Sequence, residues 1–320
     1  MISESERPMQ RTKVLFDSGG EQCAAWHYSG TNGACVVMAA GGGITKEPGT
    51  DRFAARFQSS GFSVLAFDYR RLGESGGQPR QLIRVREQLR DLEAAIACAR
   101  KLPEVEPDRV ALWGFSLSGG HVLKLAARER LTAAIAQTPF ADGMAATPNA
   151  LRHETLGVIL RFPFLALIDL LRGLVRKPPL LVPLAGPRGT VAMLTTPDAE
   201  DGDRALNPDN RYSDWQQTIA ARSVLPLGFY RPGRVARRIT TPLLVVVAEH
   251  DQSVLAAPAI RVADRAPNAT LIRVRGGHYA PFLDEHDVVV GGELQFLEQH
   301  VARPRGHTDD HQRVPASPKR

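Results

Sequence analysis

Short apolar runs alternate with segments of helical periodicity from residue 12 to residue 139. The runs at residues 34–40 and 110–113 hold only apolar side chains, as in parallel strands that are buried on both faces. The predicted strands are residues 14–16, 22–28, 34–40, 63–69, 110–113 and 133–137, and the predicted helices are residues 52–60, 82–101 and 118–129. This alternation predicts an α/β fold with a mostly parallel, doubly wound sheet.

The alternation stops at residue 140 and resumes at residue 239. The intervening segment holds an amphipathic stretch at residues 156–175, a proline-rich loop and a predicted helix at residues 215–224. After it, strands are predicted at residues 243–248 and 270–274 and helices at residues 258–265 and 287–300. Neither half would carry a complete sheet alone, so we expect one core interrupted by a helical cap. The expected boundaries are residues 12–139 and 239–302 for the core, 140–238 for the cap and 303–320 for a disordered tail.

The formal net charge of the 320-residue chain is +6, which gives no case for a nucleic-acid partner. The tail from Arg303 onward holds five basic and two acidic residues, so three of the six excess charges lie on a segment predicted to be disordered. Cys23, Cys35 and Cys98 form no CxxC pair. We interpret them as reduced thiols of a cytoplasmic protein.

Two segments bear on targeting and membranes. Residues 1–12 are polar and lack the apolar core of a secretory signal. The apolar stretch at residues 156–175 contains Arg161, Asp169 and Arg172, and charges at the centre of a bilayer are costly. We therefore expect no membrane span.

A candidate catalytic motif lies where a predicted buried strand meets a predicted helix. Its sequence is Gly114-Phe-Ser-Leu-Ser-Gly-Gly120. A sharp turn at this point strains the backbone of its central residue and lifts the side chain above the sheet edge. The amides of the first helical turn also favour a developing negative charge. Ser116 is the predicted nucleophile, and Ser118 is a weaker alternative because Ser116 would then occupy the elbow position that needs glycine.

A serine hydroxyl needs a neutral imidazole to take its proton and a carboxylate to orient that imidazole. Asp251 follows the predicted strand at residues 243–248, and His278 follows the predicted strand at 270–274. The order serine, acid, histidine, each after a successive strand, is the order expected in this kind of fold. The alternatives left open for the acid are Glu249 and Asp142. The other histidines considered are His250 and His286, expected to be solvated, and His121, expected to have a packing or capping role.

An oxyanion site needs two amide donors. Leu117, directly after the predicted nucleophile, supplies the first, and Gly42 or Gly43 in the loop after the strand at 34–40 is expected to supply the second. This glycine loop, although followed by Lys46, fits neither common phosphate-binding pattern. Asp68, which ends another predicted strand, is expected to brace the following turn through Arg70 or Arg71.

Five segments carry the candidate residues: AAGGGITKEPG, FDYRRLGESGG, WGFSLSGGHVL, AEHDQSV and GGHYAPF. Together they resemble the α/β-hydrolases, and within them the esterase and prolyl-peptidase-like branch that includes dienelactone hydrolases. They are similar to the oxyanion loop, a post-strand turn, the nucleophile elbow, the acid loop and the histidine loop of that branch. Two positions depart from its pattern: Ala40 stands where most relatives have histidine, and Ser118 where the elbow normally has its last glycine.

The cap is expected to set substrate choice, because the core supplies only the reaction. Ile44, Phe162, Trp215 and Tyr279 are predicted to line the substrate pocket. Other candidates are the apolar residues of the first cap stretch and two later aromatic residues: Leu156, Ile159, Phe164, Leu167, Phe229 and Tyr230. The alternative is that the apolar residues simply pack the cap onto the core.

The predicted function is hydrolysis of a carboxylic ester of a small to medium, apolar substrate through an acyl-enzyme, without a metal or organic cofactor. The alternatives are a thioesterase, an acyltransferase, and an aminopeptidase that would use Glu200, Asp201 or Asp203 to hold the substrate ammonium. A non-catalytic ligand-binding member of the fold is a further alternative. A small-molecule ester is the expected partner, and a homodimer is possible.

Overall fold

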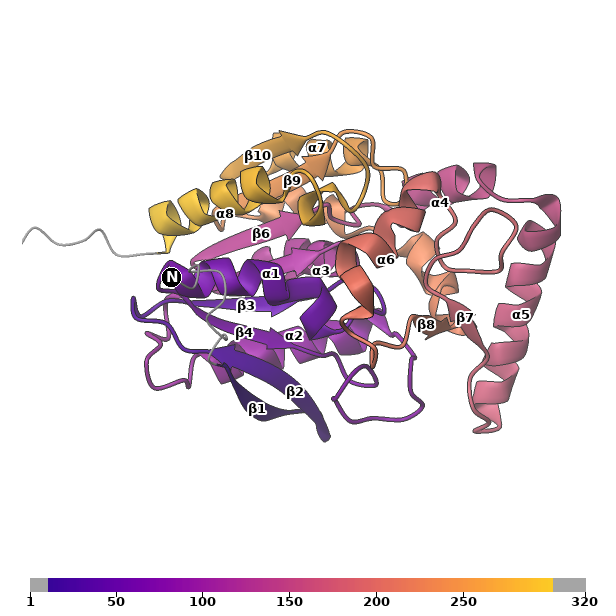
Figure 1. Cartoon of the computed structure of the whole chain (residues 1–320), viewed down its shortest axis with the longest axis horizontal. Coiled ribbons are helices and arrows are strands. Elements are labelled where there is room, and N and C mark those ends of the chain that lie inside the picture. Colours follow the sequence, from indigo (N-terminus) through magenta and orange to yellow (C-terminus); the bar gives the residue numbers. More distant parts are fainter. Residues whose placement is uncertain (1–10, 302–320) are drawn as a thin grey trace, which may run out of the picture.

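The computed structural model describes residues 11–301, and eight strands in that range form one sheet (Figure 1). They are β1 Arg11–Ser18, β2 Glu21–Tyr28, β3 Cys35–Ala39, β4 Ser63–Phe67, β5 Val110–Phe115, β6 Ala133–Gln137, β9 Leu243–Ala248 and β10 Ala269–Val274. Their order across the sheet is β1-β2-β4-β3-β5-β6-β9-β10. Only β2 pairs antiparallel, with β1 and β4, and the other neighbours are parallel. The predicted α/β class is confirmed; the predicted tail at 303–320 and the polar residues 1–10 lie outside the described range.

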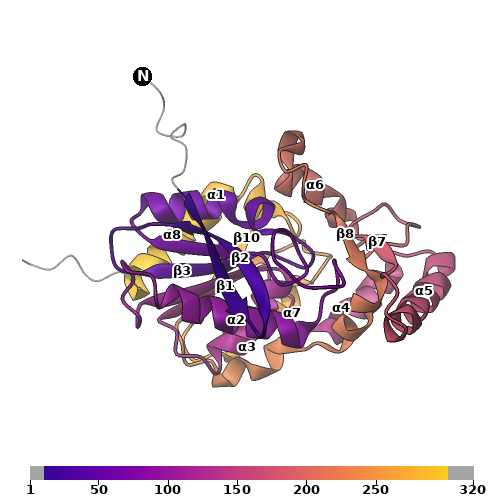
Figure 2. The ribbon, with the colours of Figure 1, turned by 90° about the horizontal axis from the view of Figure 1, so that it is seen from below.

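Helices cover both faces of this sheet (Figure 2). One face carries α1 Lys46–Ser59 and α8 His286–His300, and the other carries α2 Val85–Ala99, α3 Leu117–Ala126 and α7 Ala256–Arg265. The period of two along a strand sends alternate side chains to opposite faces. In β3, Val37 joins the cluster that contains α2, α3 and α7, whereas Val36 and Met38 join the cluster that contains α1 and α8. This two-sided burial explains the unbroken apolar runs in the sequence.

The segment of residues 140–238, called the cap below, adds no strand to the large sheet and lies beyond one end of it (Figure 1). It comprises α4 Gly143–Arg152, α5 Leu156–Leu174, α6 Asp201–Leu206, the antiparallel pair β7 Leu181–Pro183 and β8 Thr218–Ala220, and the 3-10 turns η2 Pro197–Glu200, η3 Pro208–Asn210, η4 Ala221–Ser223, η5 Leu225–Phe229 and η6 Pro232–Arg238. No helix within residues 11–301 has the length and apolar character needed to cross a membrane.

The helix predicted at residues 215–224 is wrong. Strand β8 and the turn η4 occupy this segment instead. Ile219 is fully buried opposite Val182 of β7, and the amide of Ala220 donates to the carbonyl of Gln81 at 2.8 Å. A β-branched pair, Thr218 and Ile219, with a partner strand at hand favours extended backbone over the helical spacing that the sequence suggested.

Glu293 of α8 is a buried carboxyl with one hydrogen bond, from Nε1 of Trp113 to its Oε1 at 3.0 Å. Its other oxygen has no partner among the described residues. Burial raises the pKa of Glu293 from 4.5 to about 8, so the folded chain holds this proton more tightly than the unfolded chain. The contribution of Glu293 to stability is therefore greatest below pH 4.5 and is lost as the pH rises toward 8.

Replacing Glu293 with glutamine keeps the acceptor for Trp113 and removes the titration. We expect the melting temperature of Glu293→Gln, relative to the unchanged protein, to rise between pH 5 and pH 8 and then to level off, with a gain of a few kcal/mol in unfolding free energy at the alkaline end. Thermal unfolding followed by circular dichroism at several pH values measures this. A difference that does not change with pH would contradict it.

Candidate active site

Ser116 lies at a sharp turn between β5 and α3, with φ 57° and ψ −117°. A non-glycine residue in this region of backbone space is strained and must be held by its surroundings. The neighbouring glycines allow the strand and helix to approach closely. A Cβ at Gly114 would lie 2.5 Å from the carbonyl oxygen of Ser118, and one at Gly119 would lie 2.9 Å from Cα of Pro139. The small residues of the predicted elbow are therefore required by packing.

Ser116, His278 and Asp251, called the candidate triad below, form a continuous hydrogen-bonded chain. Ser116 Oγ lies 2.9 Å from His278 Nε2, and His278 Nδ1 lies 2.8 Å from Asp251 Oδ2. Asp251 follows β9 and His278 follows β10, as the sequence predicted. The imidazole also stacks on Phe115, with ring centroids 5.0 Å apart, and Asp251 Oδ1 accepts the amide of Val254 at 2.9 Å. Each member is thus fixed by a neighbour.

The environment of His278 combines burial with negative charge. The side chains of His278 and Asp251 are 1% and 2% exposed. Burial by itself would lower the pKa of His278, but the charge and hydrogen bond of Asp251 and the charge of Asp198 raise it overall. With Nδ1–H donated to Asp251, Nε2 is free to accept the Ser116 hydroxyl proton, which is the arrangement that activates a serine.

Gly42 and Leu117 lie together beside Ser116. A Cβ at Gly42 would sit 3.4 Å from Cδ2 of Leu117, and both residues line a cavity that includes Ser116. Gly43 has φ 75° and is turned toward the cap, where its carbonyl accepts Nε1 of Trp215 at 3.1 Å. Of the two glycines expected as the second amide donor, Gly42 lines the cavities at Ser116 and Gly43 lines neither.

Ser118 braces the loop of residues 40–46, called the candidate oxyanion loop below. Its hydroxyl donates to the carbonyl oxygen of Ala40 and lies 2.7 Å from the hydroxyl of Tyr69. The two departures from the family pattern therefore meet: the serine in place of glycine holds the loop at the alanine that stands in place of histidine.

A buried ion pair holds the far end of the same loop. Lys46 Nζ lies 2.8 Å from Asp68 Oδ2 and 2.7 Å from Glu74, and the Lys46 amide donates to Asp68 Oδ1 at 2.8 Å. Asp68 does brace the following turn, by accepting the amide of Glu74 at 3.0 Å, but the expected partner, Arg70 or Arg71, is wrong. Those two arginines bind Asp91 and Glu87 instead, because Lys46 reaches Asp68 from the start of α1.

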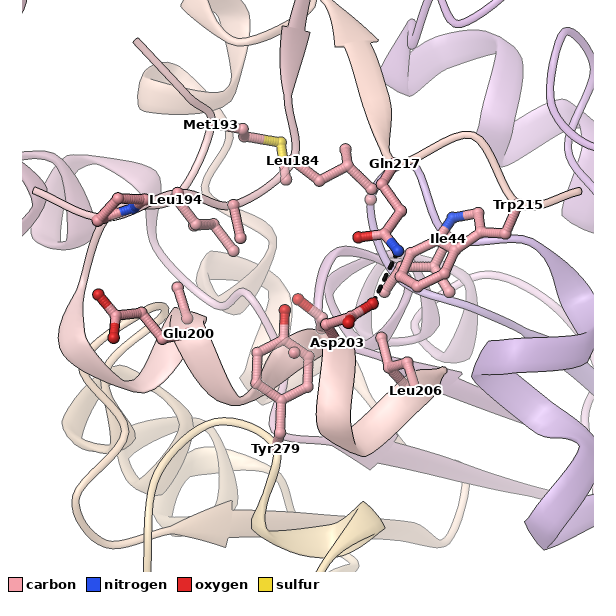
Figure 3. Close-up of a pocket in the computed structure, with 17 residues that line it drawn as sticks. Ile44, Leu184, Met193, Leu194, Glu200, Asp203, Leu206, Trp215, Gln217 and Tyr279 are labelled. Atoms are coloured by element: carbon pink, nitrogen blue, oxygen red, sulfur yellow. Dashed lines mark hydrogen bonds between the residues drawn. The ribbon is translucent and has the colours of Figure 1, made fainter. Parts of the chain in front are cut away.

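Two cavities meet at Ser116 and share Gly42, Met193 and Leu194 in their walls. The larger, about 550 Å³, lies under α4 and α5 and is lined mainly by apolar side chains, including Phe140, Ile159, Phe162, Leu225, Leu227 and Val254. The smaller, about 270 Å³, is mixed in character. Figure 3 shows Trp215, Gln217, Asp203, Glu200 and Tyr279 around it. A substrate held at Ser116 would therefore meet an apolar wall on one side and a more polar one on the other.

The sequence matches the serine aminopeptidase S33 family over residues 32–280, which is most of the chain. The chain belongs to this family. It is 38% identical over 299 residues to the quorum-quenching protein AidA of Acinetobacter baumannii, covering 92% of this chain and 96% of that protein. Thiohydrolase aneE of Aspergillus aculeatus is 35% identical over 114 residues, which is 36% of either chain.

A solved structure, the α/β-hydrolase GrgF from Penicillium, has the same fold. Its TM-score is 0.77 at 24% sequence identity, with 91% of this chain and 99% of that chain covered. The resemblance to α/β-hydrolases inferred from the sequence is thereby confirmed. The chain is a hydrolase of that superfamily.

The two alternative acids, Asp142 and Glu249, differ from Asp251 in their surroundings. Asp142 caps α4 by accepting two of its amides and forms an ion pair with Arg231 at 2.8 Å, and these contacts lower its pKa. Glu249 is exposed at the end of β9. Neither has a hydrogen bond to His278, whereas Asp251 does.

The remaining histidines also differ in their surroundings. His250 is exposed, as expected. His121 is buried, lies 2.8 Å from the hydroxyl of Tyr230, and has a pKa lowered to about 3 by burial, which fits the expected packing role. The expectation that His286 is solvated is wrong. Its ring packs on Phe53 at 4.8 Å between centroids because it starts α8 against α1.

All four predicted pocket residues of this S33 member line the cavities beside Ser116: Ile44, Trp215 and Tyr279 the smaller one, and Phe162 the larger one. Ile159 joins Phe162, and Phe229 lines the rim of the larger cavity. The expectation is wrong for Leu156, Phe164 and Leu167, which are 71%, 64% and 49% exposed on the outer face of α5, and for Tyr230, which contacts His121 instead of lining either cavity.

Three acidic residues bear on the aminopeptidase alternative. Glu200 and Asp203 line the smaller cavity, and Asp203 accepts a hydrogen bond from Gln217 at 2.8 Å. Asp201 does not line it and pairs with Arg204. Within residues 11–301, no three histidine, cysteine, aspartate or glutamate side chains gather closely enough to hold a metal ion.

Sequence reasoning missed one residue at this site, Asp198. It belongs to the cap, 80 positions before His278, and its carboxylate accepts the backbone amide of His278 at 3.1 Å. Its side chain is buried against the loops that carry Asp251 and His278. No periodicity or motif in the sequence connects a polar cap segment to a loop that distant.

Proposed function

We propose that this chain is a serine esterase that hydrolyses a carboxylic ester through an acyl-enzyme. The observation that carries the proposal is the unbroken hydrogen-bonded chain from Ser116 through His278 to Asp251, at a point where two cavities meet. A triad is recognised by such geometry and by the roles of its members.

The roles follow from the atoms. Ser116 Oγ attacks the ester carbonyl carbon while His278 Nε2 takes its proton, and Asp251 stabilises the imidazolium that forms. The amides of Leu117 and Gly42 hold the oxyanion. His278 returns the proton to the leaving alcohol oxygen, and then activates a water that attacks the acyl carbon and releases the acid from Ser116.

The larger cavity supports a substrate with an apolar arm of small to medium size. Phe140, Phe162 and Leu227 form part of its wall, and burying a chain there gains roughly 0.8 kcal/mol for each methylene removed from water. We propose that the cap, residues 140–238, selects the substrate through this cavity.

A fluorophosphonate probe followed by a panel of p-nitrophenyl esters of increasing chain length tests the proposal. We expect the probe to label Ser116 alone and kcat/KM to rise with chain length until the cavity is filled. Absence of both labelling and ester hydrolysis would contradict the proposal and favour a non-catalytic ligand-binding protein.

A thioester is the second candidate, because the A. aculeatus relative is named a thiohydrolase. Matched oxygen esters and thioesters of one acyl chain separate the two.

The name of the A. baumannii relative also makes a diffusible bacterial signal with an ester bond a substrate class to test. Signal remaining after incubation, read by a reporter strain, measures this, with Ser116→Ala as the control.

The pH dependence of kcat/KM is expected to follow the imidazole. Only neutral His278 accepts the Ser116 proton, and Asp251 and Asp198 raise the pKa of His278 above its ordinary 6.5. Activity should therefore be half-maximal above pH 6.5 and fall as the pH drops further. Initial rates at low substrate concentration between pH 5 and pH 9 check this. An acid limb centred below pH 6 would contradict the inferred environment of His278.

A further inference from the structure

Asp198 is a buried carboxylate that contacts both loops carrying the candidate triad. Its Oδ2 accepts the amide of Gln252 at 2.8 Å, that of Ser253 at 3.3 Å and that of His278 at 3.1 Å. Its Oδ1 accepts the hydroxyl of Ser253 at 2.9 Å. Because Asp251 itself accepts the amide of the residue after Ser253, two carboxylates hold one short turn from opposite sides.

The histidine loop is shaped to receive Asp198. A Cβ on Gly277, the residue before His278, would lie 2.6 Å from Cβ of Asp198. Gly276 needs its positive φ of 88°, but Gly277 has no such backbone requirement. The close approach of Asp198 therefore explains the second glycine of the sequence Gly276-Gly277-His278. Thr196 of the cap adds a contact to the other loop, the one after β9: its hydroxyl lies 2.8 Å from the hydroxyl of Ser253.

Asp198 is charged in this position. Burial would raise the pKa of Asp198, but the charge of His278 and the amide of Gln252, with further hydrogen bonds, lower it overall. The charged groups that act on the His278 ring are Asp251 and Asp198. The ring's other close neighbours are Phe115, Ser116 and Tyr279, which carry no charge near neutral pH.

We propose that Asp198 is a positioning residue that fixes the backbone of His278 and the turn after Asp251, so that a residue of the cap completes the alignment of the triad. This inference rests on the proposed function. It assigns the cap a part in the reaction step as well as in substrate choice. Asp198 lines neither cavity at Ser116, so its effect should fall on kcat and leave KM largely unchanged.

Two substitutions at Asp198 separate its geometry from its charge. Asp198→Ala removes every hydrogen bond of the carboxylate, and we expect kcat for p-nitrophenyl butyrate to fall about 10²-fold, as expected for a misplaced catalytic group. Asp198→Asn keeps the amide oxygen that accepts the three backbone amides, and its NH2 can donate to the Ser253 hydroxyl, which can turn to Thr196. We expect Asn to recover most of the lost kcat.

The charge is measured by pH. Because Asp198 raises the pKa of His278, Asp198→Asn should move the acid limb of kcat to lower pH. The matched control is Asp209→Asn, which makes the same change at an exposed cap residue whose positive φ of 54° suits asparagine. It should change neither kcat nor the acid limb. An unmoved acid limb in Asp198→Asn would overturn the proposal, as would a kcat for Asp198→Ala within twofold of the unchanged protein.

Gly277→Ala is a second, independent test in case the Asp198→Ala variant does not fold. The added methyl group displaces Asp198 but leaves its carboxylate in the protein. It should lower kcat in the same way with little change in KM, and unchanged kcat would count against the proposal. Failure of the function itself looks different. If the unchanged protein shows no hydrolysis dependent on Ser116, the proposed function fails; if it does, and the Asp198 variants match Asp209→Asn, only the inference about Asp198 fails.

Discussion

Replacing Ser116 with alanine should lower kcat for a p-nitrophenyl ester by about 10⁶-fold and abolish fluorophosphonate labelling. The reason is that Ser116 is the only group at hydrogen-bonding distance from His278 Nε2 among the described residues, and loss of the nucleophile in a serine hydrolase typically costs this factor. KM should stay similar, because the walls of both cavities remain. Steady-state kinetics on purified protein, with gel-based detection of the labelled serine, measures both effects.

Ser118→Ala is the matched control because Ser118 is the alternative nucleophile and lies only two positions further along the chain, in the first turn of α3. It should keep the label. Its kcat should fall only modestly, since its loss removes the hydrogen bond that anchors Ala40 in the candidate oxyanion loop. If Ser118→Ala loses the label and Ser116→Ala keeps it, the assignment of the nucleophile is reversed.

The parts of the fold and site that the sequence predicts are those with a local signal. The unbroken apolar run of β3 requires burial on both faces, and glycines on both sides of Ser116 require a tight turn. Strand ends can be located from such runs, and the carboxyl ends of parallel strands meet at one edge. For this reason Ser116, Asp251 and His278 could be placed together before any geometry was known, and the structure does bring them within hydrogen-bonding distance.

The parts that were missed depend on contacts between distant segments. The sequence suggests an arginine two or three positions away as the partner of Asp68, but Lys46, 22 positions earlier, reaches it because β3 and β4 are neighbours in the sheet. Asp198 has no local signal at all. In the cap, short irregular elements replace periodic ones, so burial is decided by which segment happens to pack there, as the exposed outer face of α5 also illustrates.

These two cases also separate two kinds of support for the site. Lys46 and Asp68 hold the candidate oxyanion loop from within the core, with both side chains buried. Asp198 and Trp215 come from the cap, and they contact the histidine loop and the carbonyl of Gly43. The cap therefore contacts both sides of Ser116, which favours a site whose alignment depends on the cap being in place.

Replacing Asp251 with asparagine should lower kcat by about 10⁴-fold while leaving the fold intact. Asparagine can still accept the Val254 amide through its oxygen, but its NH2 would then face His278 Nδ1. That forces the imidazole proton onto Nε2, the nitrogen that faces Ser116. A protonated Nε2 cannot accept the hydroxyl proton of Ser116. The melting temperature should change little. Kinetics at saturating ester, together with thermal unfolding, measure the two properties separately.

Glu249→Gln is the control for the Asp251 substitution, because Glu249 is the alternative acid on the same loop and is exposed. We expect its kcat to stay within twofold of the unchanged protein. If Glu249→Gln were the variant that lost activity and Asp251→Asn retained it, the loop after β9 would have to rearrange before catalysis, since the present geometry gives Asp251 the hydrogen bond to His278. The pair of variants therefore tests whether the observed arrangement is the reactive one.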